Sequence, residues 1–176
     1  RRVGSVLVEG ARVTGEAARA LGLRDETVDP QLLVTADGVK VVEVAARIPG
    51  GQMGEVPRVG TGVDLVEVAL RQALGLEVPE ELLRPRFQQP FAISFLTARP
   101  GVLPTGKVRR VEGVARAEAF PGVVRVETYI QPGETIRPVQ VDGDRRGYVI
   151  ALGDTNLDAL ERARAASRLV DVEVEA

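Results

Sequence analysis

The sequence contains no cysteine and no histidine, and only 3% of its 176 residues are aromatic. The absence of cysteine excludes disulfide scaffolds, thiolate nucleophiles and cysteine zinc sites. The absence of histidine removes the usual general base and the Ser-His-Asp triad. Any chemistry must therefore come from carboxylates, amides, arginines and backbone N–H groups. A hard ion with oxygen ligands, such as Mg²⁺, is compatible with that set.

Charge and hydropathy exclude two classes of partner. The formal net charge is −2 and both signs are mixed along the chain, so no basic block is available to neutralise a nucleic-acid backbone. No apolar run approaches the roughly 20 residues that cross a bilayer, and the first residues do not read as a signal peptide. We therefore expect a cytoplasmic protein that binds neither nucleic acid nor membrane.

Two neighbouring segments, residues 27–35 and 39–48, have the pattern of β-strands. The sequence Ala-Asp-Gly between them suits a three-residue hairpin loop, in which Gly38 takes the left-handed conformation. That loop places Gln31 opposite Glu43. A two-residue Asp-Gly turn would instead place Gln31 opposite Val44, so the register is an expectation that coordinates can test.

The second strand has two unlike faces, because successive side chains alternate sides. Residues 42, 44, 46 and 48 are apolar, and we expect them to face a core. The opposite face carries Glu43 and Arg47, two charges on a strand that is otherwise hydrophobic.

These polar residues suit an anionic ligand and a metal ion. The side-chain oxygens of Gln31 and Glu43 would lie on adjacent strands and are suitable ligands for Mg²⁺. Arg47 could bind a phosphoryl or carboxylate group in a bidentate manner. Gly50 and Gly51 follow at once and would let backbone N–H groups approach an anion. The arrangement is typical of phosphoryl transfer.

Structural explanations for the same residues remain open. Glu43 and Arg47 could form an ion pair on a solvated sheet face. Gln31 could be an ordinary exposed strand residue, and Gly50 and Gly51 could serve a tight turn. The sequence Pro-Thr-Gly-Lys at 104–107 is also read as a turn, because it precedes a strand rather than a helix.

The remaining chain predicts an α+β fold with two parts. Helices are expected at residues 11–21, ended by Gly22, and at residues 62–75, with Thr61 and Asp64 as the capping signal and Gly75 as the end. The second helix has a stripe expected to face the core: Val63, Val66, Leu70 and Leu74. After a change of composition the chain turns β-rich and then closes with a helix, for which Asp154, Thr155 and Asn156 offer an N-cap. In this helix Asp158 and Arg162 can pair, and the buried side is marked by leucines: Leu157, Leu160 and Leu169. Strands are expected at residues 91–96, 106–111, 123–129, 147–152 and 170–174. We place the domain boundary between residues 84 and 85.

The segment from Gln31 to Gly51, with its Glu-x-x-x-Arg-x-x-Gly-Gly sequence and the following Gly-Val-Asp-Leu helix, resembles the ATP-grasp superfamily. It looks most like carboxylate-amine ligases of the L-amino-acid ligase type. Relatives that continue the strand with a Gln-Val-Glu-His or a Gly-Asp-Pro-Glu sequence fit less well. Ala45 stands where the superfamily usually has a metal-binding Asn.

The resemblance implies that residues 1–84 are the C-terminal half of an ATP-grasp domain, an antiparallel sheet with helices, and that residues 85–176 are a small β-rich domain closed by a helix. It implies ATP and Mg²⁺ as cofactors, Gln31 and Glu43 as metal ligands, Arg47 as a catalytic residue, and Arg47, Gly50 and Gly51 as phosphate-binding residues. The reaction would join a carboxylate and an amine, both small molecules, through an acyl phosphate.

The nucleotide-binding lysines and the glycine-rich loop of such enzymes are not found upstream of residue 27. We therefore expect a C-terminal fragment that is inactive alone and needs the N-terminal part of the same polypeptide; a homodimer is possible. The alternative is a non-catalytic binding or assembly module derived from an ATP-grasp protein.

Overall fold

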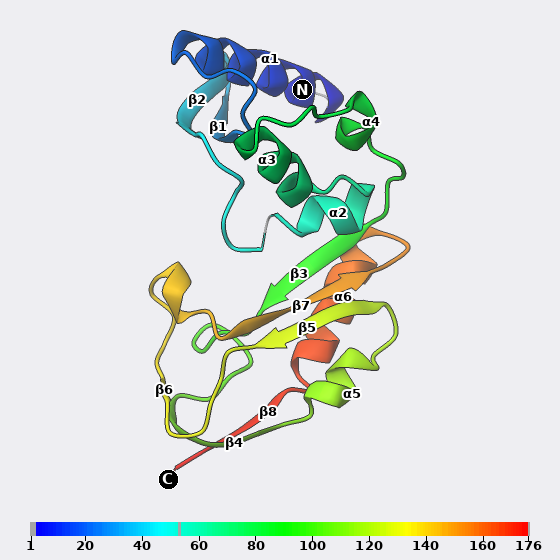
Figure 1. The fold of residues 1–176 in the computed structure, drawn as a ribbon. Coiled ribbons are helices and arrows are strands. Elements are labelled where there is room, and N and C mark those ends of the chain that lie inside the picture. The colour runs from blue at the N-terminus through cyan, green and yellow to red at the C-terminus, as the bar shows by residue number, and fades with distance from the viewer. Residues whose placement is uncertain (1–2, 53, 176) are drawn as a thin grey trace. The chain divides into compact units, whose positions relative to one another are not determined.

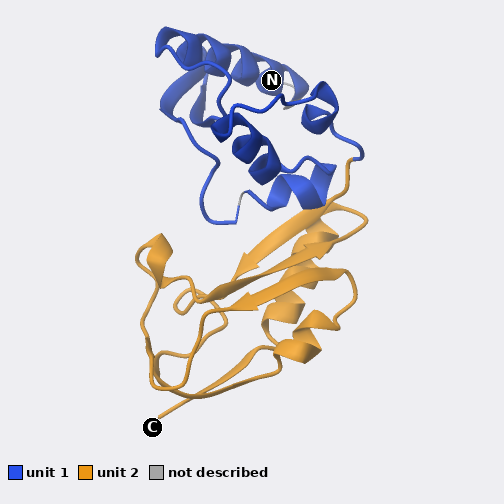
Figure 2. Cartoon of the chain, viewed as in Figure 1, with its two compact units in different colours: residues 1–87 blue, residues 88–176 orange. Residues whose placement is uncertain are grey.

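The computed structural model describes residues 3–52 and 54–175, and the chain divides into two compact units, residues 1–87 and residues 88–176 (Figure 2). Every strand pair in the described residues is antiparallel, and helices accompany the sheets in both units. The expected α+β fold class with antiparallel sheets is confirmed. Among the described residues, no helix combines the length and the apolar character that crossing a membrane requires.

Within its described residues, the first unit consists of a hairpin and four helices. Their bounds are α1 Val3–Ala20, β1 Asp29–Thr35, β2 Gly38–Ala45, α2 Val56–Thr61, α3 Leu65–Ala73 and α4 Glu80–Leu83 (Figure 1). Helix α1 packs on the hairpin and begins at Val3 rather than at residue 11. Gly10 lies inside this helix and faces β1: a Cβ there would lie 3.1 Å from Cδ1 of Leu32, so the glycine lets helix and strand approach closely.

The hairpin differs from the expected one at its turn but keeps the predicted pair. Thr35 lies opposite Gly38, so the loop has two residues, not three. A β-bulge between Gln31 and Leu32 then shifts the register by one residue, and Gln31 faces Glu43 as predicted. The prediction of this pair is confirmed, although the register next to the turn was wrong.

The two stripes expected to face a core are largely exposed in the first unit, although Val63 is buried as predicted. Val42 is 65% exposed on the hairpin, and Leu70 of α3 and Leu74 at its C-cap are 59% and 70% exposed. Among the described residues, the side of α3 opposite this stripe is the buried one, at Val68. The caps of α3 were nevertheless predicted correctly: Asp64 accepts from the backbone N–H groups of Val66 and Glu67, and Gly75 ends the helix with φ of 64°.

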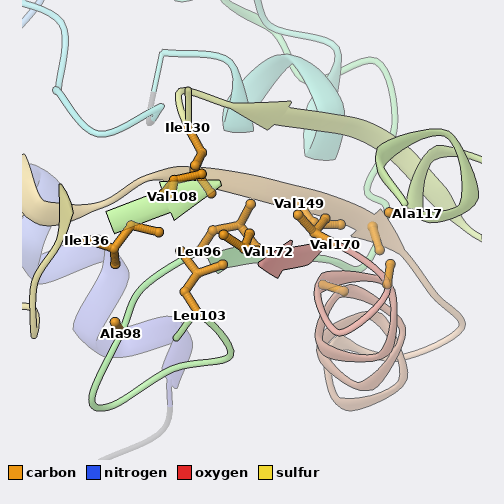
Figure 3. Close-up of a cluster of buried hydrophobic side chains, with 13 residues drawn as sticks. Leu96, Ala98, Leu103, Val108, Ala117, Ile130, Ile136, Val149, Val170 and Val172 are labelled. Atoms are coloured by element: carbon orange, nitrogen blue, oxygen red, sulfur yellow. The ribbon is translucent and has the colours of Figure 1, made fainter. Parts of the chain in front are cut away.

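The second unit has two small sheets and carries most of the core. Its elements are β3 Phe91–Phe95, β4 Gly106–Glu112, α5 Val114–Glu118, β5 Val123–Thr128, β6 Thr135–Ile136, η1 Asp142–Asp144, β7 Gly147–Leu152, α6 Asn156–Ser167 and β8 Asp171–Val174. The strand orders are β3-β7-β5 and β6-β4-β8. Side chains from both sheets meet in one hydrophobic cluster, which includes Leu96, Leu103, Val149 and Val172 (Figure 3).

Helix α6 covers β3 and β7 through its small residues. Its N-cap is Thr155, as predicted, and the expected pair between Asp158 and Arg162 forms, with Nε and Oδ1 3.0 Å apart. The prediction that Leu157 marks the buried side is wrong because that side chain is largely exposed. Alanines fill the interface instead, which lets the helix lie close to the sheet: Ala159, Ala163 and Ala166.

Tyr148→Phe tests the polar contact between β5 and β7. The Tyr148 hydroxyl, in a side chain only 1% exposed, donates to Oε2 of Glu127 at 2.6 Å, and this bond is the main reason that the pKa of Glu127 lies below its ordinary value. A lowered pKa means that the ionised carboxylate stabilises the fold above its ordinary pKa, and that this stability is lost as pH falls through the folded pKa.

We expect Tyr148→Phe to lower the free energy of unfolding by about 1 kcal/mol at neutral pH and by less in acid. Denaturant unfolding at several pH values measures both quantities. A loss that is equal at every pH would contradict the linkage to Glu127.

Candidate functional site

The polar residues singled out in the sequence lie at the open end of the β1–β2 hairpin and in the loop that follows. Gln31 and Glu43 are direct cross-strand partners, so their side chains share one face of the hairpin. Both are exposed. Neither side chain has a hydrogen bond or an ion pair within the described part of the chain. Two oxygen donors are therefore available side by side.

Arg47 lies beyond the end of β2 at Ala45, because the strand is shorter than predicted. Its Nη1 donates to the backbone oxygen of Ile48 at 2.9 Å and lies 3.6 Å from Oδ2 of Asp29. The side chain is 59% exposed. The guanidinium is thus tethered at one corner and open to solvent elsewhere, which suits a group that receives an anion.

Asp29 is the residue that the sequence analysis missed here. It is the cross-strand partner of Ala45, and it shares the face of Gln31 because the two are separated by one residue on β1. Ala45 has no polar side chain, so the Asp29 carboxylate is the polar group of this cross-strand pair. The alternation of β1 was a signal that could have found it.

Gly50 and Gly51 lie in the turn after the hairpin and differ in what their backbone requires. Gly51 has φ of 62°, a conformation that side chains disfavour. Gly50 has no positive φ, and a Cβ added to it would meet nothing within 4 Å. The turn therefore accounts for the glycine at position 51, while the fold by itself gives no reason for the glycine at position 50.

The two glycines line a pocket of about 330 Å³ together with Arg58 of α2. Arg58 is bound to Glu55, with Nη2 and Oε1 2.9 Å apart. Helix α2 contains a proline and a glycine and has no periodic pattern, so the sequence analysis did not single out Arg58.

Arg47 lines a different pocket, of about 430 Å³. There it stands with Thr27 and with Gln72 of α3, whose Oε1 accepts from the threonine hydroxyl at 2.8 Å. Glu43 lines neither pocket. The structure thus joins Gln31 with Glu43 and Gly50 with Gly51, but it does not gather all the candidate residues around one cavity.

A metal ion would have few protein ligands at this place. The described residues contain no cluster of three or more acidic, histidine or cysteine side chains that could hold one. The Gln31 amide and the Glu43 carboxylate provide two donors, and Mg²⁺ commonly completes its shell with water and with phosphate oxygens of a substrate. The pair therefore fits a shared protein–substrate site better than a closed protein cage.

Comparison with known proteins finds matches to parts of longer chains. Residues 95–175 match the family model of the L-amino acid ligase C-terminal domain 2. An uncharacterised curated protein from Sinorhizobium fredii, y4rH, is 29% identical over 150 residues, which are 84% of this chain and 29% of that protein.

Solved structures show the same fold at low identity. Phosphoribosylglycinamide synthetase from Anaerococcus prevotii superposes with a TM-score of 0.86 at 11% identity, over 99% of this chain and 43% of its own. L-amino acid ligase from Bacillus licheniformis superposes with a TM-score of 0.78 at 17% identity, over 100% of this chain and 44% of its own. A third structure is the biotin carboxylase domain of 2-oxoglutarate carboxylase from Hydrogenobacter thermophilus, solved with MgADP, ADP and bicarbonate. It superposes with a TM-score of 0.64 at 21% identity, over 90% of this chain and 34% of its own.

In each of these comparisons the chain spans less than half of the other protein. The likeness to the solved structures extends over both units, whereas the family model covers most of the second unit and none of the hairpin.

Proposed function

Because the chain has the fold of the C-terminal part of an ATP-grasp carboxylate-amine ligase, we propose that the protein containing it joins a carboxylate to an amine in an ATP-dependent reaction. The carboxylate is first phosphorylated to an acyl phosphate, and the amine then displaces phosphate to give an amide or peptide bond. The observation that carries the proposal is the Gln31–Glu43 pair, placed on a fold shared with ligases.

Gln31 and Glu43 would hold the Mg²⁺ of a Mg-ATP complex in this proposal. Both side chains are exposed and unengaged within the described residues, and both offer the oxygen donors that this ion prefers. When bound, the ion would neutralise charge on the phosphate oxygens. Ala45 adds no ligand, so the protein contributes two donors here, and two-metal coordination is not part of the proposal.

Arg47 would act on the transferring phosphoryl group and on the acyl phosphate. A guanidinium stabilises negative charge that spreads over phosphoryl oxygens, and its fork suits bidentate contact. Asp29 and the carbonyl of Ile48 hold one edge of this guanidinium, which leaves its remaining donors for substrate. Gly50 and Gly51 line the other pocket, where their backbone N–H groups would meet a phosphate group.

Further polypeptide would complete the active site and cover the first unit. Large apolar side chains of that unit are exposed on the hairpin and on α3, among them Val42 and Leu70. Large apolar side chains exposed together are typical of a contact surface. We propose that it packs against an N-terminal part of the same polypeptide, as the length of the structural neighbours supports.

A non-catalytic binding or assembly module is the second candidate. The same exposed apolar surface favours it, because an assembly module needs a contact surface and needs no metal ligands. The two candidates differ in what they require of Glu43 and Arg47: only the ligase depends on them.

Gly50→Ala separates a turn from an anion contact. The substitution meets no atom within 4 Å, so we expect no change in unfolding, whereas a backbone that approaches phosphate closely would be blocked. We expect phosphate release by the full-length protein to fall at least about tenfold, the equivalent of one hydrogen bond to a charged group. Gly51→Ala is the comparison, since its φ of 62° predicts lower stability as well. Unchanged activity in Gly50→Ala would restrict both glycines to the turn.

The function is tested by Mg-ATP-dependent phosphate release from the full-length protein, supplied with amino acids singly and in pairs. The ligase predicts release that requires both a carboxylate and an amine, with one amide formed for each phosphate. Release without an acceptor amine would contradict amide formation, and no release with any pair would favour the assembly module.

A further inference from the structure

The second unit contains a groove that the proposed ligase site does not use. It lies between the edge strand β3, the loop at residues 97–102 and the last turns of α6, and its volume is about 620 Å³. Three arginines line it, and no acidic side chain does: Arg145, Arg164 and Arg168. All its lining residues lie within the second unit, so the groove needs no other part of the chain.

Arg145 is fixed in place at one side of the groove. Its guanidinium lies 4.1 Å from the centroid of the Phe95 ring, within the range of a cation–π contact. One of its nitrogens, Nη2, also lies 2.7 Å from Oδ1 of Asp142. The charge of Arg145 is therefore partly neutralised, and its flat group covers the aromatic ring.

Arg164 and Arg168 contribute charge that the described residues do not neutralise. Arg164 lies in the last turn of α6 and Arg168 is its C-cap, four residues later, so both side chains lie on the same side of the helix end and repel each other. Neither side chain has an acidic partner or a hydrogen bond within residues 3–52 and 54–175. By contrast, Arg162 on the same helix is bound to Asp158.

The position of these two arginines near the C-terminal end of α6 has a structural explanation as well, because a positive charge there interacts favourably with the helix dipole. That explanation does not account for the apolar side chains between the cations. Ile93, Val102 and Leu160 line the same groove, and Val102 is exposed. A groove lined by arginines and by apolar side chains suits a ligand that has both an anionic group and an apolar part.

We propose that this groove binds a small organic anion, a carboxylate or phosphate attached to an aromatic or aliphatic group. The oxyanion lies between Arg164 and Arg168, whose guanidinium forks match the oxygens of either group. The apolar part lies over Val102 and Leu160. The groove has the size of sites that take such molecules, about 300–1,000 Å³.

The test is calorimetric titration of the whole chain with phenyl phosphate and with phenylacetate. Inorganic phosphate and benzyl alcohol are titrated separately, because each supplies half of the proposed ligand. We expect a phenyl-bearing anion to bind at least about tenfold more tightly than either half. The tighter of the two anions identifies which oxyanion the arginines prefer.

The double substitution Arg164→Gln and Arg168→Gln should weaken this binding by at least about tenfold, while the far-UV spectrum stays unchanged. The matched control is Arg116→Gln with Arg137→Gln, which removes the same charge from exposed arginines outside the groove. It should leave binding unchanged. Val102→Asp should weaken binding by placing an acid in the groove.

Three results would overturn the proposal. These are no binding of either phenyl-bearing anion, equal binding of inorganic phosphate, and an equal loss in the control variant. Unchanged binding in the double variant together with a lower melting temperature would assign Arg164 and Arg168 to the helix dipole alone.

Discussion

Glu43→Gln in the full-length protein is expected to abolish Mg-ATP-dependent phosphate release while leaving the fold intact. The exchange keeps the shape of the side chain and removes the negative charge that would bind the metal. Glu43 is exposed and has no partner among the described residues, so the fold does not depend on its carboxylate. A loss of at least about a thousandfold is expected, since charge neutralisation dominates phosphoryl transfer.

Glu81→Gln is the matched control for this experiment. Glu81 is also an exposed glutamate of the first unit, on α4, and it lies outside the hairpin. Phosphate release should be unchanged in that variant, and both variants should unfold at the same denaturant concentration as the parent. Activity retained in Glu43→Gln would remove the metal assignment.

Leu96→Ala is expected to lower the free energy of unfolding of the second unit by about 2–5 kcal/mol. Leu96 is fully buried, and it packs in the cluster that joins the two sheets (Figure 3). Removing three carbon atoms there leaves a cavity that close-packed neighbours fill incompletely. Denaturant unfolding measures the change. It is followed by far-UV circular dichroism, because the chain has no tryptophan for fluorescence.

Leu70→Ala is the comparison in the first unit, at a leucine that this chain leaves largely exposed. We expect a change within about 0.5 kcal/mol in the isolated chain. In the full-length protein, where we propose that further polypeptide covers α3, the same substitution should cost more. An equal, small effect in both forms would argue against that cover.

Signals that act over a few residues predicted the structure well. Gly22 and Gly75 end α1 and α3 with positive φ, and Asp64 and Thr155 cap the N-termini of α3 and α6 through side-chain oxygens. Each of these features depends on one backbone conformation or one hydrogen bond, which a residue type specifies almost alone.

Hydrophobic stripes were less informative, because a stripe shows that a side chain needs a partner without showing where that partner is. The stripe through Leu70 and Leu74 was predicted to face a core and instead faces outward in this chain. Helix α6 shows the reverse case: small residues such as Ala163, which carry little hydropathy signal, make its buried contact.

The candidate site was predicted in part. The Gln31–Glu43 pair was expected from the turn, yet it depends on a bulge that no residue in the sequence marked. Asp29 lies close to Arg47 because it pairs with Ala45 at the open end of the hairpin, two residues before the arginine. Arg58 depends on the packing of α2, a helix too short and too rich in helix-breaking residues for periodicity to reveal.

The central claim is that a carboxylate is activated by phosphoryl transfer at the edge formed by Glu43 and Arg47. The most direct measurement supplies the full-length protein with Mg-ATP, an amine and a carboxylate labelled with heavy oxygen, and follows the label by mass spectrometry. An acyl phosphate predicts transfer of one labelled oxygen from the carboxylate to the released phosphate with each amide formed. Phosphate that carries no label, released alongside amide, would contradict the claim.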